Sequence, residues 1–227
     1  MDEKDLPILH SAKKLTITFP EPLEEIKGEA NATKDIVTKK CAYTPDGRLF
    51  VNRKAFSDLL VTDAKGARRV YNDLDDDDKL ENGSEEYATV ESVQKEISKR
   101  VQEPRDTLVR ERLKYNEEAL KSARDAPELE KKREIAESKI RKELPAVKRK
   151  KLKAAKVDEL TGAPLNAPEV HHKDRVADNP RRALDESNLA VLNKETHRTG
   201  EDSVHKKNIE TEEEFEKYKE ELTRRST

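Results

Sequence analysis

The sequence predicts a helix-rich α+β protein with a small N-terminal α+β unit, a central region of long helices and a C-terminal domain that contains a histidine cluster. Charged residues make up 42% of the 227 residues and hydrophobic residues only 33%, whereas typical domains have about 25% and about 45–50%. The hydrophobic spacing changes from strand-like to helical along the chain. A chain this polar buries small cores and amphipathic helices rather than one thick core.

Residues 1–72 are expected to form the small α+β unit. Residues 15–19 alternate between apolar and polar, which predicts a strand. Two apolar segments, 41–43 and 49–51, flank the turn sequence Thr-Pro-Asp-Gly at 44–47. Proline presets φ and glycine supplies a positive φ, so a β-hairpin is expected there. A helix is expected to follow, with Phe56, Leu59 and Leu60 at helical spacing.

Residues 73–87 are expected to be an acidic linker, because they include four consecutive aspartates at 75–78. A charge run of this kind is usually solvated. The alternative is an acidic segment that mimics nucleic acid or covers a basic site.

Residues 88–156 are expected to form two or three helices. Apolar residues recur three and four positions apart, and Pro104, Pro127 and Pro145 interrupt the pattern. The stripes are narrow, so the helices of 88–145 are expected to pair with each other, with a second copy of the chain or with a protein partner. The stripes are Val90, Val93, Ile97 and Val101; Leu108, Val109, Leu113 and Leu120; and Leu129, Ile135, Ala136 and Ile140.

The most basic stretch ends this region and begins with Lys148, Arg149, Lys150 and Lys151. A cationic helix can neutralise phosphates and give salt-dependent affinity for DNA of any sequence. The alternative is a solvated helix face. The net charge of −2 predicts no partner by itself.

Cys41 is the only cysteine, which excludes a disulfide within the chain and a cysteine-based zinc site. The first residues lack the basic start and apolar core of a signal peptide. No stretch approaches the ~20 apolar residues that a membrane span needs. The sequence therefore predicts a soluble cytoplasmic protein without a membrane partner.

The remaining residues, 157–227, contain four of the five histidines. Val170, His171 and His172 are expected to form a short strand, in which consecutive side chains point to opposite faces. A polar loop follows, and then a second apolar strand begins at Asn188. His197 lies where a helix should begin. Imidazole both binds metals and moves protons near neutral pH, so this group predicts a catalytic or metal-binding site.

The order and spacing of these residues resemble the HNH endonuclease family, over residues 157–205. The resemblance implies a ββα-metal fold of two strands and a helix that hold one divalent metal ion, with Mg or Mn expected first and Zn or Ni as alternatives. It implies that His171 and His197 bind the metal, that His172 is the general base and that Asn188 braces the loop. Glu201, four residues after His197, is a minor candidate for a third ligand. DNA is the expected substrate, in a bacterial or phage-infected cell.

The chain departs from many members of this family, which carry two Cys-x-x-Cys pairs around a structural zinc. The corresponding positions here are Asp158, Thr161, Asn193 and Thr196. We therefore expect no structural zinc, with hydrogen bonds or packing in its place.

Other residues of this region are given supporting roles. Lys173, Arg175 and Arg198 are expected phosphate contacts together with the basic residues 148–151, and His205 is expected at the surface or on a phosphate. Aromatic and apolar residues at helical spacing near the end predict a C-terminal helix that packs on the domain. These residues are Phe215, Tyr218 and Leu222.

Two other functions are open on the sequence. The histidines could bind a structural zinc in a non-catalytic module, or the chain could be a nuclease-derived protein that binds DNA or another protein without cutting. A purely structural site needs no base beside a ligand, so the position of His172 favours the nuclease.

Overall fold

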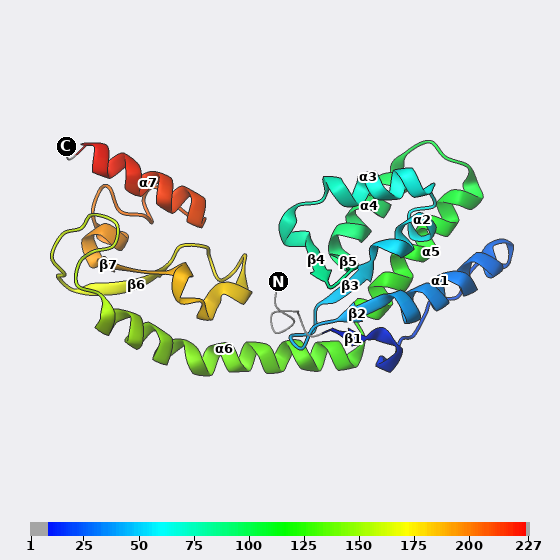
Figure 1. Ribbon diagram of the computed structural model, residues 1–227, viewed down its shortest axis with the longest axis horizontal. Coiled ribbons are helices and arrows are strands. Elements are labelled where there is room, and N and C mark those ends of the chain that lie inside the picture. Colours follow the sequence, from blue (N-terminus) through cyan, green and yellow to red (C-terminus); the bar gives the residue numbers. More distant parts are fainter. Residues whose placement is uncertain (1–8, 226–227) are drawn as a thin grey trace. The chain divides into compact units, whose positions relative to one another are not determined.

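The computed structural model describes residues 9–225 (Figure 1), and the chain divides into two compact units, Met1–Ala136 and Glu137–Thr227. The protein belongs to the helix-rich α+β class, as predicted. The prediction that the first residues are not a signal peptide falls on residues 1–7, which lie outside the residues that the structure describes. None of the helices within residues 9–225 combines the length and apolar character needed to cross a membrane.

Unit 1 is built on a five-stranded antiparallel sheet in the order β1-β2-β3-β5-β4. The predicted hairpin is confirmed, with Cys41 paired to Val51 and a positive φ of 85° at Gly47 in the turn. A side chain at Gly47 would also meet the carbonyl oxygen of Leu129 at 2.6 Å. Cys41 itself is buried in the core. The strands are β1 (His10–Ser11), β2 (Cys41–Tyr43), β3 (Leu49–Asn52), β4 (Lys79–Asn82) and β5 (Glu85–Thr89).

The prediction of a strand at residues 15–19 is wrong, because this segment joins no sheet. Its apolar side chains do pack against the core, which explains the alternating pattern. The backbone amide of Thr16, however, donates to the carboxylate of Glu128 at 3.1 Å instead of to a neighbouring strand. The alternation of apolar and polar residues at 15–19 therefore reflects the burial of every second side chain and not pairing within a sheet.

The prediction of an acidic linker at residues 73–87 is also wrong. Its second half forms β4 and most of β5, and Glu81 and Glu86 are paired across this hairpin. β4 lies at the sheet edge, where charged residues are common because they discourage pairing with other chains. The Thr89 hydroxyl donates to Asp78 at 2.6 Å and so ties the acidic run to the sheet.

The helices predicted within residues 88–156 are present, but they are not a separate region. The helix pair α4 and α5 packs together and belongs to the core of unit 1. The first two apolar stripes supply buried side chains to that core, including Ile97 and Leu120. The helices of unit 1 are α1 (Lys27–Lys40), α2 (Phe56–Leu59), α3 (Ala64–Asp73), α4 (Val90–Gln102), α5 (Thr107–Arg124) and the first part of α6 (Pro127–Ala154).

Helix α6 differs from the prediction in two ways. Pro145 lies inside the helix and does not end it. The third apolar stripe is not buried beyond Leu129, and Ile135 is 60% exposed. The boundary between the two units falls within this helix, after Ala136.

Unit 2 contains the antiparallel pair β6 (Pro168–His172) and β7 (Leu189–Asn193), in which His171 is paired with Ala190. Both strands were predicted. The helix expected at His197 is a single π-helical turn, Glu195–Thr199, that ends at Gly200. A Cβ atom at Gly200 would lie 2.9 Å from the Glu195 carbonyl oxygen. The chain passes so close to this carbonyl at the end of the turn that the position favours glycine.

The predicted C-terminal helix is confirmed as α7 (Glu212–Arg225). Phe215 and Tyr218 on this helix pack on the strand pair, together with Leu160, Ala190, Leu192 and Val204. This small core holds the histidine-bearing strand in place. Short 3-10 helices complete the chain at Ala12–Lys14, Glu24–Ile26, Arg53–Ala55, Asp76–Asp78, Pro180–Leu184 and Glu186–Asn188.

Candidate metal centre

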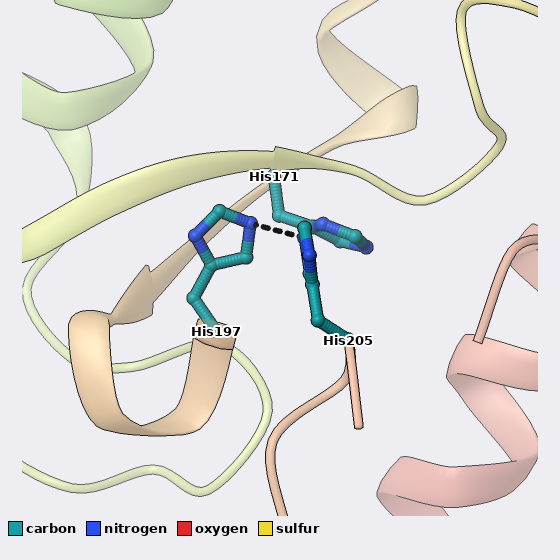
Figure 2. A group of neighbouring side chains, drawn as sticks. All are labelled: His171, His197 and His205. Atoms are coloured by element: carbon teal, nitrogen blue, oxygen red, sulfur yellow. Dashed lines mark hydrogen bonds between the residues drawn. The ribbon is translucent and has the colours of Figure 1, made fainter. Parts of the chain in front are cut away.

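Three histidines of unit 2 converge on one point (Figure 2). His171 comes from β6, His197 from the π-helical turn and His205 from the loop that follows it. Each offers one ring nitrogen, and the three nitrogens lie within 4.8 Å of one another. The sequence predicted the first two as ligands, whereas His205 was expected at the surface. The backbone amide of His205 donates to the His197 carbonyl oxygen at 3.2 Å, which brings the loop back over the turn.

The spacing of the nitrogens suits one metal ion. Nε2 of His197 and Nε2 of His205 are 3.1 Å apart. Two nitrogens bound to one ion at about 2.1 Å, at angles between a right angle and the tetrahedral value, lie roughly 3.0–3.4 Å apart. Both side chains could therefore bind the same ion with little movement.

Glu169 orients His197. Its carboxylate lies 2.7 Å from Nδ1 of His197. An ionised carboxylate only accepts hydrogen bonds, so Nδ1 donates and the lone pair of Nε2 faces the other histidines. The hydrogen bonds from His197 and Arg198 hold the pKa of Glu169 below its usual range. Sequence reasoning missed Glu169, although it lies two residues before His171 and therefore on the same face of the strand.

His171 has a ring nitrogen without a hydrogen-bond partner. The side chain is buried, and its Nε2 has no hydrogen-bond partner among the residues that the structure describes. Burial is the largest cause that lowers the pKa of His171, to about 3, and the neighbouring imidazoles of His197 and His205 disfavour a second positive charge beside them. The ring therefore stays neutral near pH 7, which is the form that binds a metal. It stacks on Phe215, with ring centroids 5.9 Å apart.

His172, the predicted general base, lies outside the three-histidine group. The half-buried ring places Nε2 3.1 Å from the carbonyl oxygen of Ala183. A carbonyl oxygen only accepts, so Nε2 donates and Nδ1 keeps its lone pair. Burial lowers the pKa of His172, and the ring is therefore neutral near pH 7. A neutral imidazole with a free lone pair can accept a proton.

Asn188 makes the main-chain hydrogen bonds that the bracing role requires. The residue is fully buried, its carbonyl oxygen accepts from the Lys173 amide at 2.8 Å, and its side-chain oxygen accepts from the Asp174 amide at 2.8 Å. Its side-chain nitrogen donates to the Arg182 carbonyl oxygen at 3.1 Å. Asn188 thus ties both ends of the loop together and fixes Ala183, the partner of His172.

Glu201 is not brought to the three-histidine group. Its side chain is 93% exposed and pairs with Lys206 at 2.7 Å. The prediction assumed a helix that continues past His197, but the turn ends at Gly200 and directs Glu201 outwards. His205, and not Glu201, lies with His171 and His197.

Most of the basic side chains expected to bind phosphates are already held in ion pairs. Lys173 pairs with Glu212 and Glu216, Arg175 with Glu210, Arg198 with Glu169, Lys150 with Glu186 and Lys151 with Glu159. Within residues 9–225, neither Lys148 nor Arg149 has an acidic side chain at ion-pair distance. The free positive charge of the predicted phosphate contacts is therefore concentrated on these two residues.

No protein-family model, no curated protein and no solved structure matches this chain.

Proposed function

We propose that residues 157–227 form a metal-dependent endonuclease of the HNH type that hydrolyses phosphodiester bonds in DNA. The observation that carries the proposal is the convergence of ring nitrogens of His171, His197 and His205 within 4.8 Å. The residue after His171 in β6 is a fourth imidazole, His172, which is neutral near pH 7 and whose Nε2 lies against the carbonyl oxygen of Ala183. A metal-binding group and an unliganded base are the two functions that hydrolysis of a phosphodiester requires.

The donor set favours particular metals. Three imidazole nitrogens suit Zn²⁺ or Ni²⁺, whereas Mg²⁺ and Mn²⁺ prefer oxygen ligands. We therefore place Zn or Ni ahead of the Mg or Mn expected from the sequence. When bound, a divalent cation would act as a Lewis acid that stabilises charge on the leaving oxygen.

The chain's own residues account for the proton transfer. Nδ1 of His172 takes a proton from water as the water oxygen attacks phosphorus and the bond to the leaving oxygen breaks. The Ala183 carbonyl oxygen holds Nε2–H and stabilises the imidazolium that forms. Asn188 keeps this carbonyl in place through its hydrogen bond to the preceding residue, Arg182.

Plasmid cleavage with a panel of divalent metals, comparing the wild type with His172→Ala, tests the proposal. Loss of a general base should lower the rate by about 10²–10⁴-fold, while metal binding persists. His10→Ala is the matched control, because His10 lies in unit 1 beside Tyr43. Cleavage by His172→Ala at the wild-type rate would overturn the assignment.

One observation favours a second candidate, a non-catalytic module with a structural metal. His172 lies outside the group of three histidines and already bonds to a backbone carbonyl oxygen. For such a module, metal should raise the unfolding temperature of the wild type and of His172→Ala equally, and no preparation should cut DNA. Retained DNA binding without cleavage would identify a nuclease-derived binding protein.

A further inference from the structure

The last turns of α6 are fixed next to the histidine-bearing strands by two ion pairs. Lys150 binds Glu186 at 2.5 Å, in the loop that leads to Asn188. Lys151 binds Glu159 at 3.2 Å, and the other carboxylate oxygen of Glu159 accepts from the backbone amide of Val191 in β7 at 3.1 Å. The helix end is therefore held both to the loop and to the strand pair.

This attachment determines where Lys148 points. Lys148 precedes Lys151 by three residues, so the two side chains lie on the same face of α6. That face is turned toward the strand pair, because Lys151 reaches Glu159. The positive charge of Lys148 accordingly lowers the pKa of both His171 and His172.

Lys148 also differs from an ordinary surface lysine. It is half-buried, and burial lowers the pKa of its own amine. No acidic side chain of the described part of the chain lies within ion-pair distance of it. An ammonium group that is partly desolvated and unpaired is costly, so an anion arriving there would be bound favourably.

We propose that Lys148 binds the phosphate group of duplex DNA that lies against His172, and that Arg149 and Lys153 bind neighbouring phosphates on the exposed face of α6. The catalytic part of this inference rests on the proposed nuclease function; the binding part does not. Arg149 and Lys153 are four residues apart and share one face. Together with Ala146 and Lys150 they line a shallow groove along the helix.

The charge distribution favours a phosphate backbone as the occupant. The acids of unit 2 neutralise the basic residues of the histidine loop, whereas the exposed side chains of Arg149 and Lys153 have no acidic partner within residues 9–225. Duplex DNA carries one negative charge for about every 1.7 Å of its axis. Its closely spaced phosphates therefore supply separate anions for Lys148 and for the exposed cations of the same helix.

Binding of a fluorescein-labelled DNA duplex, followed by anisotropy in the presence of a metal chelator, tests the inference without any cleavage. Lys148→Gln should weaken binding roughly tenfold and lower the slope of log K against log salt by about 0.9, the value for one phosphate contact. Lys142→Gln is the matched control, because it removes the same charge from an exposed position on the same helix. Lys142→Gln should change the DNA affinity and the salt slope less than Lys148→Gln does.

Cleavage kinetics supply a second readout. Because the contact is to the reacting phosphate, Lys148→Gln should lower kcat as well as raise KM, and Lys148→Arg should restore part of both. A wild-type salt slope in Lys148→Gln would overturn the inference even if the enzyme cuts DNA. Equal displacement of the duplex by polyglutamate or by single-stranded RNA would also overturn it. DNA binding that depends on Lys148 in a protein that never cuts would instead refute only the nuclease.

Discussion

The side chain of Asp158 accepts a hydrogen bond of 2.6 Å from the backbone amide of Asn193 at the end of β7. Asp158 is fully buried, and its other oxygen accepts from the amides of Leu160 and Thr161. One carboxylate therefore joins the turn at 158–163 to the end of β7. The sequence predicted that hydrogen bonds or packing would hold these positions together.

Replacement of Asp158 should therefore be costly. Asp158→Ala leaves three backbone amides without their acceptor, and each hydrogen bond to a charged group contributes about 1.5–3 kcal/mol. We expect the free energy of unfolding to fall by about 3 kcal/mol or more in urea titrations. Asp178→Ala, which removes an exposed carboxylate paired with Arg175 at 3.4 Å, should cost about 1 kcal/mol or less. Equal effects of the two substitutions would contradict the structural role of Asp158.

Glu169 should control metal affinity without touching the metal. Glu169→Gln can present an amide N–H to Nδ1 of His197, which favours the tautomer whose Nε2 carries a proton. Loss of such a partner typically lowers metal affinity about 10–100-fold. Isothermal titration calorimetry with Zn²⁺ or Ni²⁺ measures the effect, and Glu201→Gln is the control. An affinity unchanged in Glu169→Gln would show that this carboxylate does not set the tautomer.

His205 should behave as a metal ligand and Glu201 should not. His205→Ala removes one of the three converging nitrogens, so metal affinity should fall at least as far as in Glu169→Gln, by about 10-fold or more. Glu201→Ala should leave the affinity unchanged, because its carboxylate is exposed and pairs with Lys206. A larger loss of metal affinity in Glu201→Ala than in His205→Ala, in the same calorimetric titrations, would support Glu201 as the third ligand, as expected from the sequence.

The burial of His171 predicts a stability that depends on pH when metal is chelated. Its pKa is about 3 in the folded protein and about 6.5 when unfolded, so below the unfolded value the unfolded chain binds more protons. Stability is therefore fully present above about pH 6.5 and is lost progressively down to about pH 3. Between pH 7 and pH 5 the contribution is up to about 2 kcal/mol.

Urea titrations at several pH values, with chelator present, check this dependence. His171→Leu keeps an apolar contact to Phe215 but has no titrating group, so its free energy of unfolding should vary less with pH than that of the wild type. Identical slopes for the two proteins would mean that His171 is not held neutral by burial.

Local patterns predicted the parts of the fold whose partners are close in sequence. The hairpin around Gly47 and the helix with Phe215 and Tyr218 follow from turn chemistry and from spacing. The segment around Thr16 was misassigned because its backbone partner, Glu128, is 112 residues away. Charge alone also misassigned β4, since an edge strand and a solvated linker tolerate the same acidic residues.

The candidate site shows the same contrast between local and distant partners. Order and spacing predicted that His171 and His197 would share a site, and the structure brings them together, whereas the roles of His172 and Asn188 stay predictions. His205 could not be predicted in this way, because its arrival depends on where the turn after His197 ends and on the backbone hydrogen bond that returns the loop. Glu169 could have been found from its position, because it shares a strand face with His171. This position becomes informative only once His197 is known to lie against that face.

The burial of Cys41 has a practical consequence for labelling. Burial raises the pKa of this thiol to about 12, and thiol reagents attack the thiolate. The native cysteine should therefore remain unmodified at neutral pH in the folded protein. A cysteine introduced on an exposed residue such as Lys217 would be the one reactive thiol of the chain. A fluorophore attached there could follow metal and DNA binding in the same molecule without removal of the native residue.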